Sequence, residues 1–196
     1  MSRFEVFPVE KIPGAWLVAS KIHADDRGSF CELLRADVFP ALGCPPFVQA
    51  NLSTSRCDTV RGLHWHAHQW DLWHVIEGEA LVRLVDLRRD ECTTWADVMG
   101  PGDIRADCQI TDMALLIPPG VAHGFAVLGD APVRLLYHVT RYYDPTDEHT
   151  MAWDDPVVRH QKAALMDAGG TPRMSARDSA APDYATARAA AREWWP

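Results

Sequence analysis

The sequence has few cysteines and no long apolar run. Its five cysteines are an odd number and include no C-x-x-C pair. This pattern fits reduced thiols in a cytosolic protein better than a disulfide framework. No stretch approaches the roughly 18 consecutive apolar residues of a membrane-spanning helix, and residues 1–5 lack the apolar core of a signal peptide. We therefore expect a cytoplasmic protein without a membrane partner.

Basic residues are outnumbered by acidic ones. The chain carries 19 Lys and Arg against 27 Asp and Glu, a net charge of −8. Nonspecific nucleic-acid binding needs a basic footprint, so we expect no nucleic-acid partner. An anionic small ligand stays compatible, because a local arginine cluster can oppose the overall field. A length of 196 residues favours a single domain, residues 1–196.

Helical periodicity is nearly absent between residues 47 and 140. Short apolar runs alternate there with turns rich in Gly, Pro or Asp, which predicts a sandwich or barrel, most naturally a double-sheet jelly roll. The core should span about residues 15–145, and a C-terminal extension about 146–196. Strands are expected at 4–8, 16–19, 30–34, 47–53, 59–66, 71–76, 80–87, 93–98, 103–105, 114–117, 123–127 and 133–140. Short helices are expected at 37–42 and 184–195.

One stretch within these runs, residues 60–78, is rich in histidine. Residues two apart in a strand share a face, so His64 and His66 should enter one cavity while Trp65 points away. Asp71 follows, and His123 comes after a Pro-Gly turn. Three imidazoles and a carboxylate suit a divalent transition metal such as Fe, Mn, Ni or Zn, and the spacing resembles the metal motifs of the cupin superfamily. The alternative is a polar cavity that holds no metal.

The same residue types also suit proton transfer. A neutral histidine is a general base near pH 7, and a carboxylate that fixes its tautomer makes it more effective. A tyrosine on the opposite wall would return a proton from the other face. Such a pair inverts a stereocentre beside a carbonyl group through an enolate.

Seven motifs occur in order along the chain. They are Asp26–Glu32, Phe47–Ser53, Arg61–His64, Ile117–Phe125, Tyr142–Tyr143, Trp153–Pro156 and Ser175–Asp178. Together they resemble the dTDP-4-dehydrorhamnose 3,5-epimerase family, a cupin-fold family, over most of the chain. The resemblance implies an all-β double-stranded β-helix (cupin jelly roll) with a short C-terminal helical extension. It also implies a homodimer that acts on a nucleotide sugar, with dTDP as the first choice, and requires no cofactor.

The resemblance further implies roles for individual residues. His64 matches the catalytic base, Asp178 the acid that orients it, and Tyr137 the tyrosine on the other face. The matched substrate-binding positions are Arg27, Phe30, Glu32, Gln49, Asn51, Arg61, His123 and Tyr143. The first three of these are often supplied across a dimer interface, and Arg61 corresponds to an arginine near the diphosphate.

Two positions depart from the family pattern. The family usually has Gln where this chain has His66, and Lys where it has Asp71. That lysine faces the keto oxygen and would stabilise enolate charge. Both changes complete the metal set His64, His66, Asp71 and His123. However, His64 cannot be a ligand and a free base at once.

Three hypotheses follow from these departures. The first is an epimerase of a nucleotide-diphosphate-linked 4-keto-6-deoxy sugar, in which a metal replaces the lysine. The second is a family member with narrowed or altered activity, such as inversion at C3 only. The third is a metal-dependent cupin enzyme of another reaction type, or a non-catalytic sugar-binding member.

Overall fold

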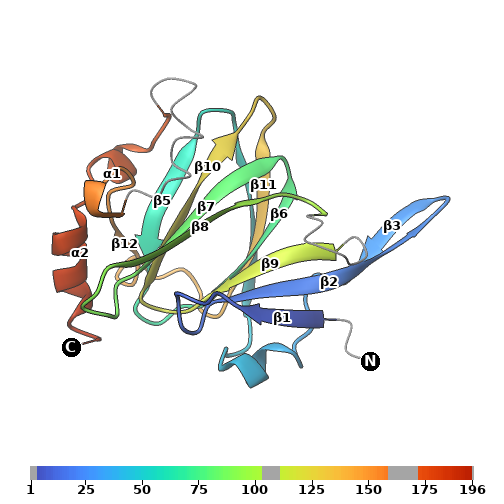
Figure 1. Cartoon of the computed structure of the whole chain (residues 1–196), viewed down its shortest axis with the longest axis horizontal. Helices are drawn as coiled ribbons and strands as arrows, with labels where there is room; N and C mark the ends of the chain where they lie inside the picture. The colour runs from blue at the N-terminus through green and yellow to red at the C-terminus, as the bar shows by residue number, and fades with distance from the viewer. Residues whose placement is uncertain (1–3, 103–110, 159–171, 196) are drawn as a thin grey trace.

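The computed structural model describes residues 4–102, 111–158 and 172–195, which build two antiparallel sheets (Figure 1). One sheet has the order β1 (Phe4–Pro8), β2 (Trp16–Asp25), β9 (Thr111–Ile117), β6 (Asp71–Glu77), β11 (Val133–Val139), β4 (Gln49–Ser55), with β3 (Gly28–Cys31) paired to β2. The other has the order β12 (His149–Thr150), β5 (Val60–Trp65), β10 (Val121–Leu128), β7 (Glu79–Asp86), β8 (Thr93–Met99). The predicted all-β jelly roll is therefore confirmed.

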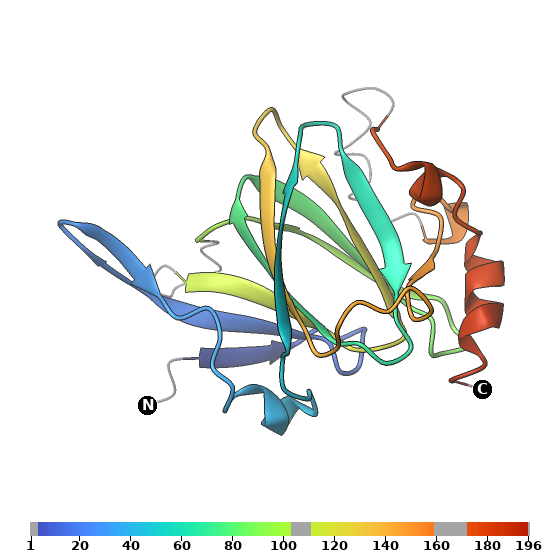
Figure 2. The ribbon, with the colours of Figure 1, turned by 180° about the vertical axis from the view of Figure 1, so that it is seen from behind.

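The predicted strands are found with shifted ends. β2 continues to Asp25, past the expected end at Ala19, because its second half pairs with β3 in a hairpin. β3 ends at Cys31, so Glu32 is not in a strand as predicted. The strand expected at 103–105 lies outside the described residues. Figures 1 and 2 show the β2–β3 hairpin extending beyond the body of the molecule.

The main core lies between the two sheets. Side chains from β6 and β11 face side chains from β7 and β10 there, including Trp73, Val75, Leu135, Val82, Leu84 and Phe125. β7 is buried on its other face as well, where Leu81 and Val85 pack in a second cluster with Ala187 and Ala191. Burial on both faces explains why β7 reads as a nearly continuous apolar run rather than an alternating one.

The helical segments are short, and they cover the outer faces of the sheets. The expected helix at 37–42 is a 3₁₀ helix, η1 (Phe39–Leu42). After a second 3₁₀ turn, η2 (Pro156–Val158), come α1 (Ala176–Ser179) and α2 (Tyr184–Ala191). Both α helices lie outside β5 (Figure 2). Among the described helices, none has the length and apolar character needed to cross a membrane.

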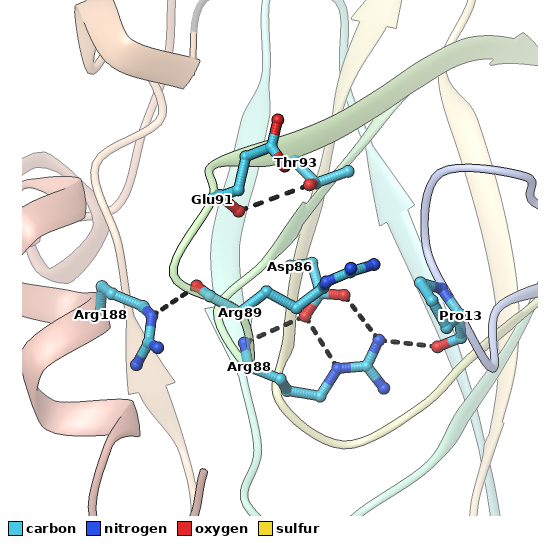
Figure 3. A network of polar contacts seen from close by, with 7 residues as sticks. All are labelled: Pro13, Asp86, Arg88, Arg89, Glu91, Thr93 and Arg188. Carbon is cyan, nitrogen blue, oxygen red and sulfur yellow. Dashed lines mark hydrogen bonds and ion pairs between the residues drawn. The ribbon is translucent and has the colours of Figure 1, made fainter. Parts of the chain in front are cut away.

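A polar network ties the C-terminal extension to the β7–β8 turn (Figure 3). Arg188 of α2 donates from Nε to the carbonyl oxygen of Arg89 at 2.7 Å. Arg88 donates from Nε and Nη2 to the carboxylate of the fully buried Asp86, each at 2.8 Å, and from Nη2 to the carbonyl oxygen of Pro13 at 2.7 Å. The contact between Arg188 and Arg89 joins α2 of the extension, which also carries Asp178, to the β7–β8 turn.

Candidate active site

A cavity of about 280 Å³ opens between the two sheets. It is lined by β4, β5, β6, β10 and β11 together with the segment 141–148. The predicted site residues that line it are Gln49, Asn51, Arg61, His64, His66, Asp71, His123, Tyr137 and Tyr143. The structure therefore brings most of the predicted residues to one place.

A bulge between β5 and β10 decides which side chains of β5 face the cavity. His123 pairs with His64, but Phe125 pairs with Arg61, so the register shifts between them. This re-aims the strand, and both Arg61 and His64 line the cavity although they are three residues apart. Gly62 permits the bulge: its φ is +98°, and a Cβ there would lie 2.7 Å from the carbonyl oxygen of His123.

His64 is held by a carboxylate from the C-terminal extension. Its Nε2 lies 2.7 Å from Oδ1 of Asp178, at the start of α1. Burial by itself would raise the pKa of Asp178, but hydrogen bonds from His64 and Ser175 and the charge of His64 hold it below its usual value. Asp178 is therefore anionic at neutral pH, and we assign the proton of His64 to Nε2, which leaves Nδ1 as the acceptor.

Tyr137 belongs to the opposite wall of the cavity. It lies on β11 of the seven-stranded sheet, whereas His64 lies on β5 of the five-stranded sheet. Burial raises the pKa of Tyr137, and the negative charge of Asp71 raises it further. The phenol is therefore protonated at neutral pH and is available as a proton donor. On neighbouring β4, Gln49 donates from Nε2 to Oδ1 of Asn51 at 2.8 Å.

Three of the four predicted metal ligands come together. One ligand atom each of His66, Asp71 and His123 lies within 4.8 Å of the other two. The fourth, His64, directs Nε2 to Asp178 instead. Burial lowers the pKa of His123 to about 4, despite the opposing effect of Asp71, so this imidazole is neutral at pH 7.

The segment 144–148 holds two residues that sequence reasoning missed. Asp147 accepts hydrogen bonds from the backbone N–H groups of Ala67 at 2.6 Å and His68 at 3.2 Å. Glu148 lines the cavity and pairs with Arg177 at 2.9 Å. The sequence around them indicates only a turn after Asp144-Pro145, so no local signal marks them as parts of the site.

The hairpin residues predicted to bind the nucleotide lie elsewhere. Arg27, Phe30 and Glu32 do not line this cavity. The side chain of Arg27 is 84% exposed and pairs with Asp25 at 2.6 Å, and Phe30 is 61% exposed. Within one chain, these residues are not brought to His64.

Comparisons with known proteins support the family resemblance of the sequence. The family model described as dTDP-4-dehydrorhamnose 3,5-epimerase matches residues 9–186. The spore coat polysaccharide biosynthesis protein SpsL of Bacillus subtilis is 40% identical over 138 residues, covering 69% of this chain and 86% of SpsL. The dTDP-4-dehydrorhamnose 3,5-epimerase of Salmonella typhimurium is 32% identical over 178 residues, covering 87% of this chain and 91% of that protein.

Solved structures with the same fold include enzymes acting on related sugars. NovW, a 4-keto-6-deoxy sugar epimerase of Streptomyces spheroides, superposes with a TM-score of 0.80 at 28% identity, over 100% of this chain and 94% of its own. RmlC of Legionella pneumophila, in complex with dTDP-4-keto-L-rhamnose, gives 0.79 at 28%, over 93% of each chain. ChmJ, a 3′-monoepimerase of Streptomyces bikiniensis in complex with dTDP-quinovose, gives 0.76 at 26%, over 94% and 90%. With seven motifs in order, a shared fold and a family model spanning residues 9–186, this chain belongs to the dTDP-4-dehydrorhamnose 3,5-epimerase family of isomerases.

Proposed function

We propose that this protein epimerises a dTDP-linked 4-keto-6-deoxy sugar at C3, or at C3 and C5. One observation carries the proposal: His64, oriented by Asp178, and Tyr137 line the same cavity from opposite sheets. Inversion needs a base on one face of a carbon and an acid on the other. The 4-keto group makes the neighbouring C–H bonds acidic, so such a pair has a reaction to perform there.

The proposed reaction proceeds in two proton transfers. Nδ1 of His64 takes the proton from C3 or C5, the electrons of the C–H bond move toward C4, and the keto oxygen becomes an enolate oxygen. The hydroxyl of Tyr137 then donates a proton to the same carbon from the other face. Solvent reprotonates the tyrosinate, and the imidazolium of His64 releases its proton to solvent. Asp178 fixes the tautomer of His64 and stabilises the imidazolium that forms.

Substrate binding is assigned to polar residues around this pair. Arg61 lines the cavity with its guanidinium group anchored by Nε donation to Oγ of Ser55 at 2.7 Å, and it would contact the diphosphate. Gln49, Asn51 and Tyr143 would contact the sugar and the nucleotide. The local positive charge of Arg61 would allow the anionic diphosphate to bind to a chain with a net charge of −8.

A homodimer would explain the positions of the remaining predicted substrate-binding residues. Arg27, Phe30 and Glu32 lie on or next to the β2–β3 hairpin, which extends beyond the body of the molecule (Figure 1), and none of them lines the cavity of its own chain. An exposed aromatic ring on such an arm is suited to a partner's surface. We propose that the hairpin reaches the cavity of a second copy, where Arg27 and Phe30 contact the nucleotide. We also propose a reducing compartment, the cytoplasm, in which the cysteines Cys44, Cys57 and Cys92 stay as thiols.

Solvent exchange tests the proposed reaction. In deuterium oxide, the protein should incorporate deuterium at C3 of dTDP-4-keto-6-deoxyglucose, and at C5 if both centres are inverted, as followed by NMR. His64→Asn should abolish incorporation at every position. Absence of exchange with the wild-type protein would refute the epimerase proposal and favour a non-catalytic sugar-binding member.

The residue at position 71 bears on whether one centre or two are inverted. Asp71 stands where the family usually has the lysine that faces the keto oxygen. Without that cation, stabilisation of the enolate is weaker unless another positive charge replaces it. Exchange at C3 but not at C5 would show the narrowed, single-centre activity. A second candidate function, a metal-dependent reaction of another type, is supported by the cluster of His66, Asp71 and His123.

A further inference from the structure

His66, Asp71 and His123 form a compact cluster on the wall of the cavity. His66 follows the end of β5, Asp71 begins β6, and His123 lies on β10, so the cluster joins the two sheets. Asp71 and His123 are only 3% and 4% exposed. The mutual distances of at most 4.8 Å between their ligand atoms are close to the spacing around one metal ion. Ligands at about 2.0–2.2 Å from an ion lie roughly 3–4 Å apart, so only a small closure is needed.

Both imidazoles are oriented in the way that metal ligands are. Nδ1 of His66 contacts the carbonyl oxygen of Asp147 at 2.6 Å, and Nδ1 of His123 contacts that of Val121 at 2.9 Å. A carbonyl oxygen only accepts, so each Nδ1 carries the proton and each Nε2 presents a lone pair. Histidines that bind metals typically donate their other N–H group in this manner.

The carboxylate of Asp71 is also held by hydrogen bonds. Oδ1 of Asp71 accepts from Nε2 of Gln69 at 2.8 Å, and Oδ2 accepts from Nε1 of Trp73 at 3.2 Å. Within the described structure, the carboxylate of Asp71 forms an ion contact with Nε2 of His123. This distance of 3.8 Å is too long for a hydrogen bond. A buried carboxylate therefore faces imidazole lone pairs, and a cation between them would compensate its charge.

We infer that His66, Asp71 and His123 bind one divalent transition-metal ion of the kind that takes imidazole and carboxylate ligands, such as Zn²⁺, Fe²⁺, Mn²⁺ or Ni²⁺. His64 stays outside this set because its ring nitrogens do not belong to the group of ligand atoms that lie within 4.8 Å of one another, and its Nε2 contacts Asp178, so a metal and a free base coexist in one cavity. All three ligands line the same cavity as His64 and Tyr137. There the ion would polarise the keto oxygen in place of the missing lysine. This last role, unlike the binding itself, rests on the proposed function.

Metal binding is tested on full-length protein made without a histidine tag and stripped with a chelator. Calorimetric titration with Zn²⁺ should show one ion per chain, and Zn²⁺ should raise the melting temperature. Asp71→Ala and His66→Ala should each weaken binding at least about 100-fold and abolish the thermal shift. His64→Asn and His68→Ala are the matched controls and should retain both. An undiminished site in the Asp71→Ala variant, or no binding by the wild type, would overturn the assignment.

Deuterium exchange separates the site from its catalytic role. The stripped wild-type protein should lose most of its exchange at C3 and regain it when the ion is returned. Stoichiometric binding with exchange that is indifferent to the metal would refute the catalytic role and support the site alone. Stoichiometric binding without any exchange would support the site and refute the proposed function, so the two failures are distinguishable.

Discussion

Nε2 of His64 lies 2.7 Å from Oδ1 of Asp178, although the two residues are 114 positions apart in the chain. The contact joins a strand of the five-stranded sheet to the C-terminal extension. It makes Nδ1 the atom of His64 that is free to take a proton. The extension is therefore part of the site as well as a cover for the sheet.

Asp178→Asn should lower the exchange rate by about 10²–10⁴-fold, because an amide does not hold the tautomer or stabilise the imidazolium. Deuterium incorporation at C3 measures this loss. Asp183→Asn is the control: Asp183 is exposed and caps α2 through the backbone N–H of Thr186 at 2.8 Å. It should cost little stability, because Asn caps a helix about as well as Asp does, and it should leave the rate unchanged. Equal rates in both variants would contradict the proposed pairing.

Tyr137→Phe should separate the two proton transfers. His64 is intact in this variant, so deuterium should still enter from the face of the base, while formation of the inverted product falls by about 10²-fold or more. NMR of the sugar gives both quantities in one experiment. Tyr142→Phe, which changes a 72% exposed tyrosine at the same cavity, should affect neither. Unchanged product formation in Tyr137→Phe would exclude Tyr137 as the acid.

Gly62→Ala should destabilise the fold through the β5–β10 bulge. The added Cβ would lie 2.7 Å from the carbonyl oxygen of His123, in addition to the strain of a positive φ. Gly129→Ala is a matched control, since its φ is +68° and no atom lies within 4 Å of the added Cβ. We expect Gly62→Ala to cost about 2 kcal/mol more than Gly129→Ala. Urea unfolding measures the difference, and equal costs would argue against a bulge that depends on Gly62.

His138→Gln should reduce the dependence of stability on pH. Burial lowers the pKa of His138, and the nearby His74 lowers it further. Below about pH 6.5 the unfolded chain binds a proton at this position that the folded chain does not bind. The free energy of unfolding therefore falls as the pH drops, with stability fully present above that range. Between about pH 7 and 5, the variant should lose less stability than the wild type in urea unfolding. Parallel curves would contradict this origin.

Phe30→Ser should shift the protein toward a monomer, because it removes an exposed aromatic ring from the hairpin. Sedimentation velocity over a dilution series measures the equilibrium. Tyr142→Ser removes an even more exposed aromatic ring, 72% against 61%, from the cavity rather than from the hairpin, and should not change the oligomeric state. A wild-type protein that sediments as a monomer would refute the proposed role of the hairpin.

The sequence by itself determined the fold class, the family and much of the cavity wall. Period-two alternation places His64 and His66 on the cavity side, while Trp65 packs in the outer cluster. This information is local, because a strand sets the direction of a side chain within two residues. The motifs around Arg61 and Ser175 could also be recognised in the sequence, because each consists of neighbouring residues.

Only the tertiary structure decided which of these groups meet. The bulge at Gly62 turns Arg61 to the side of His64, and its geometry depends on β10, far along the chain. The packing of α1 against β5 brings Asp178 into contact with His64. The packing of the two sheets places His66, Asp71 and His123 together in a separate cluster. The sequence alone could not decide whether His64 is a base or a metal ligand, because spacing shows which residues share a face but not where each nitrogen points.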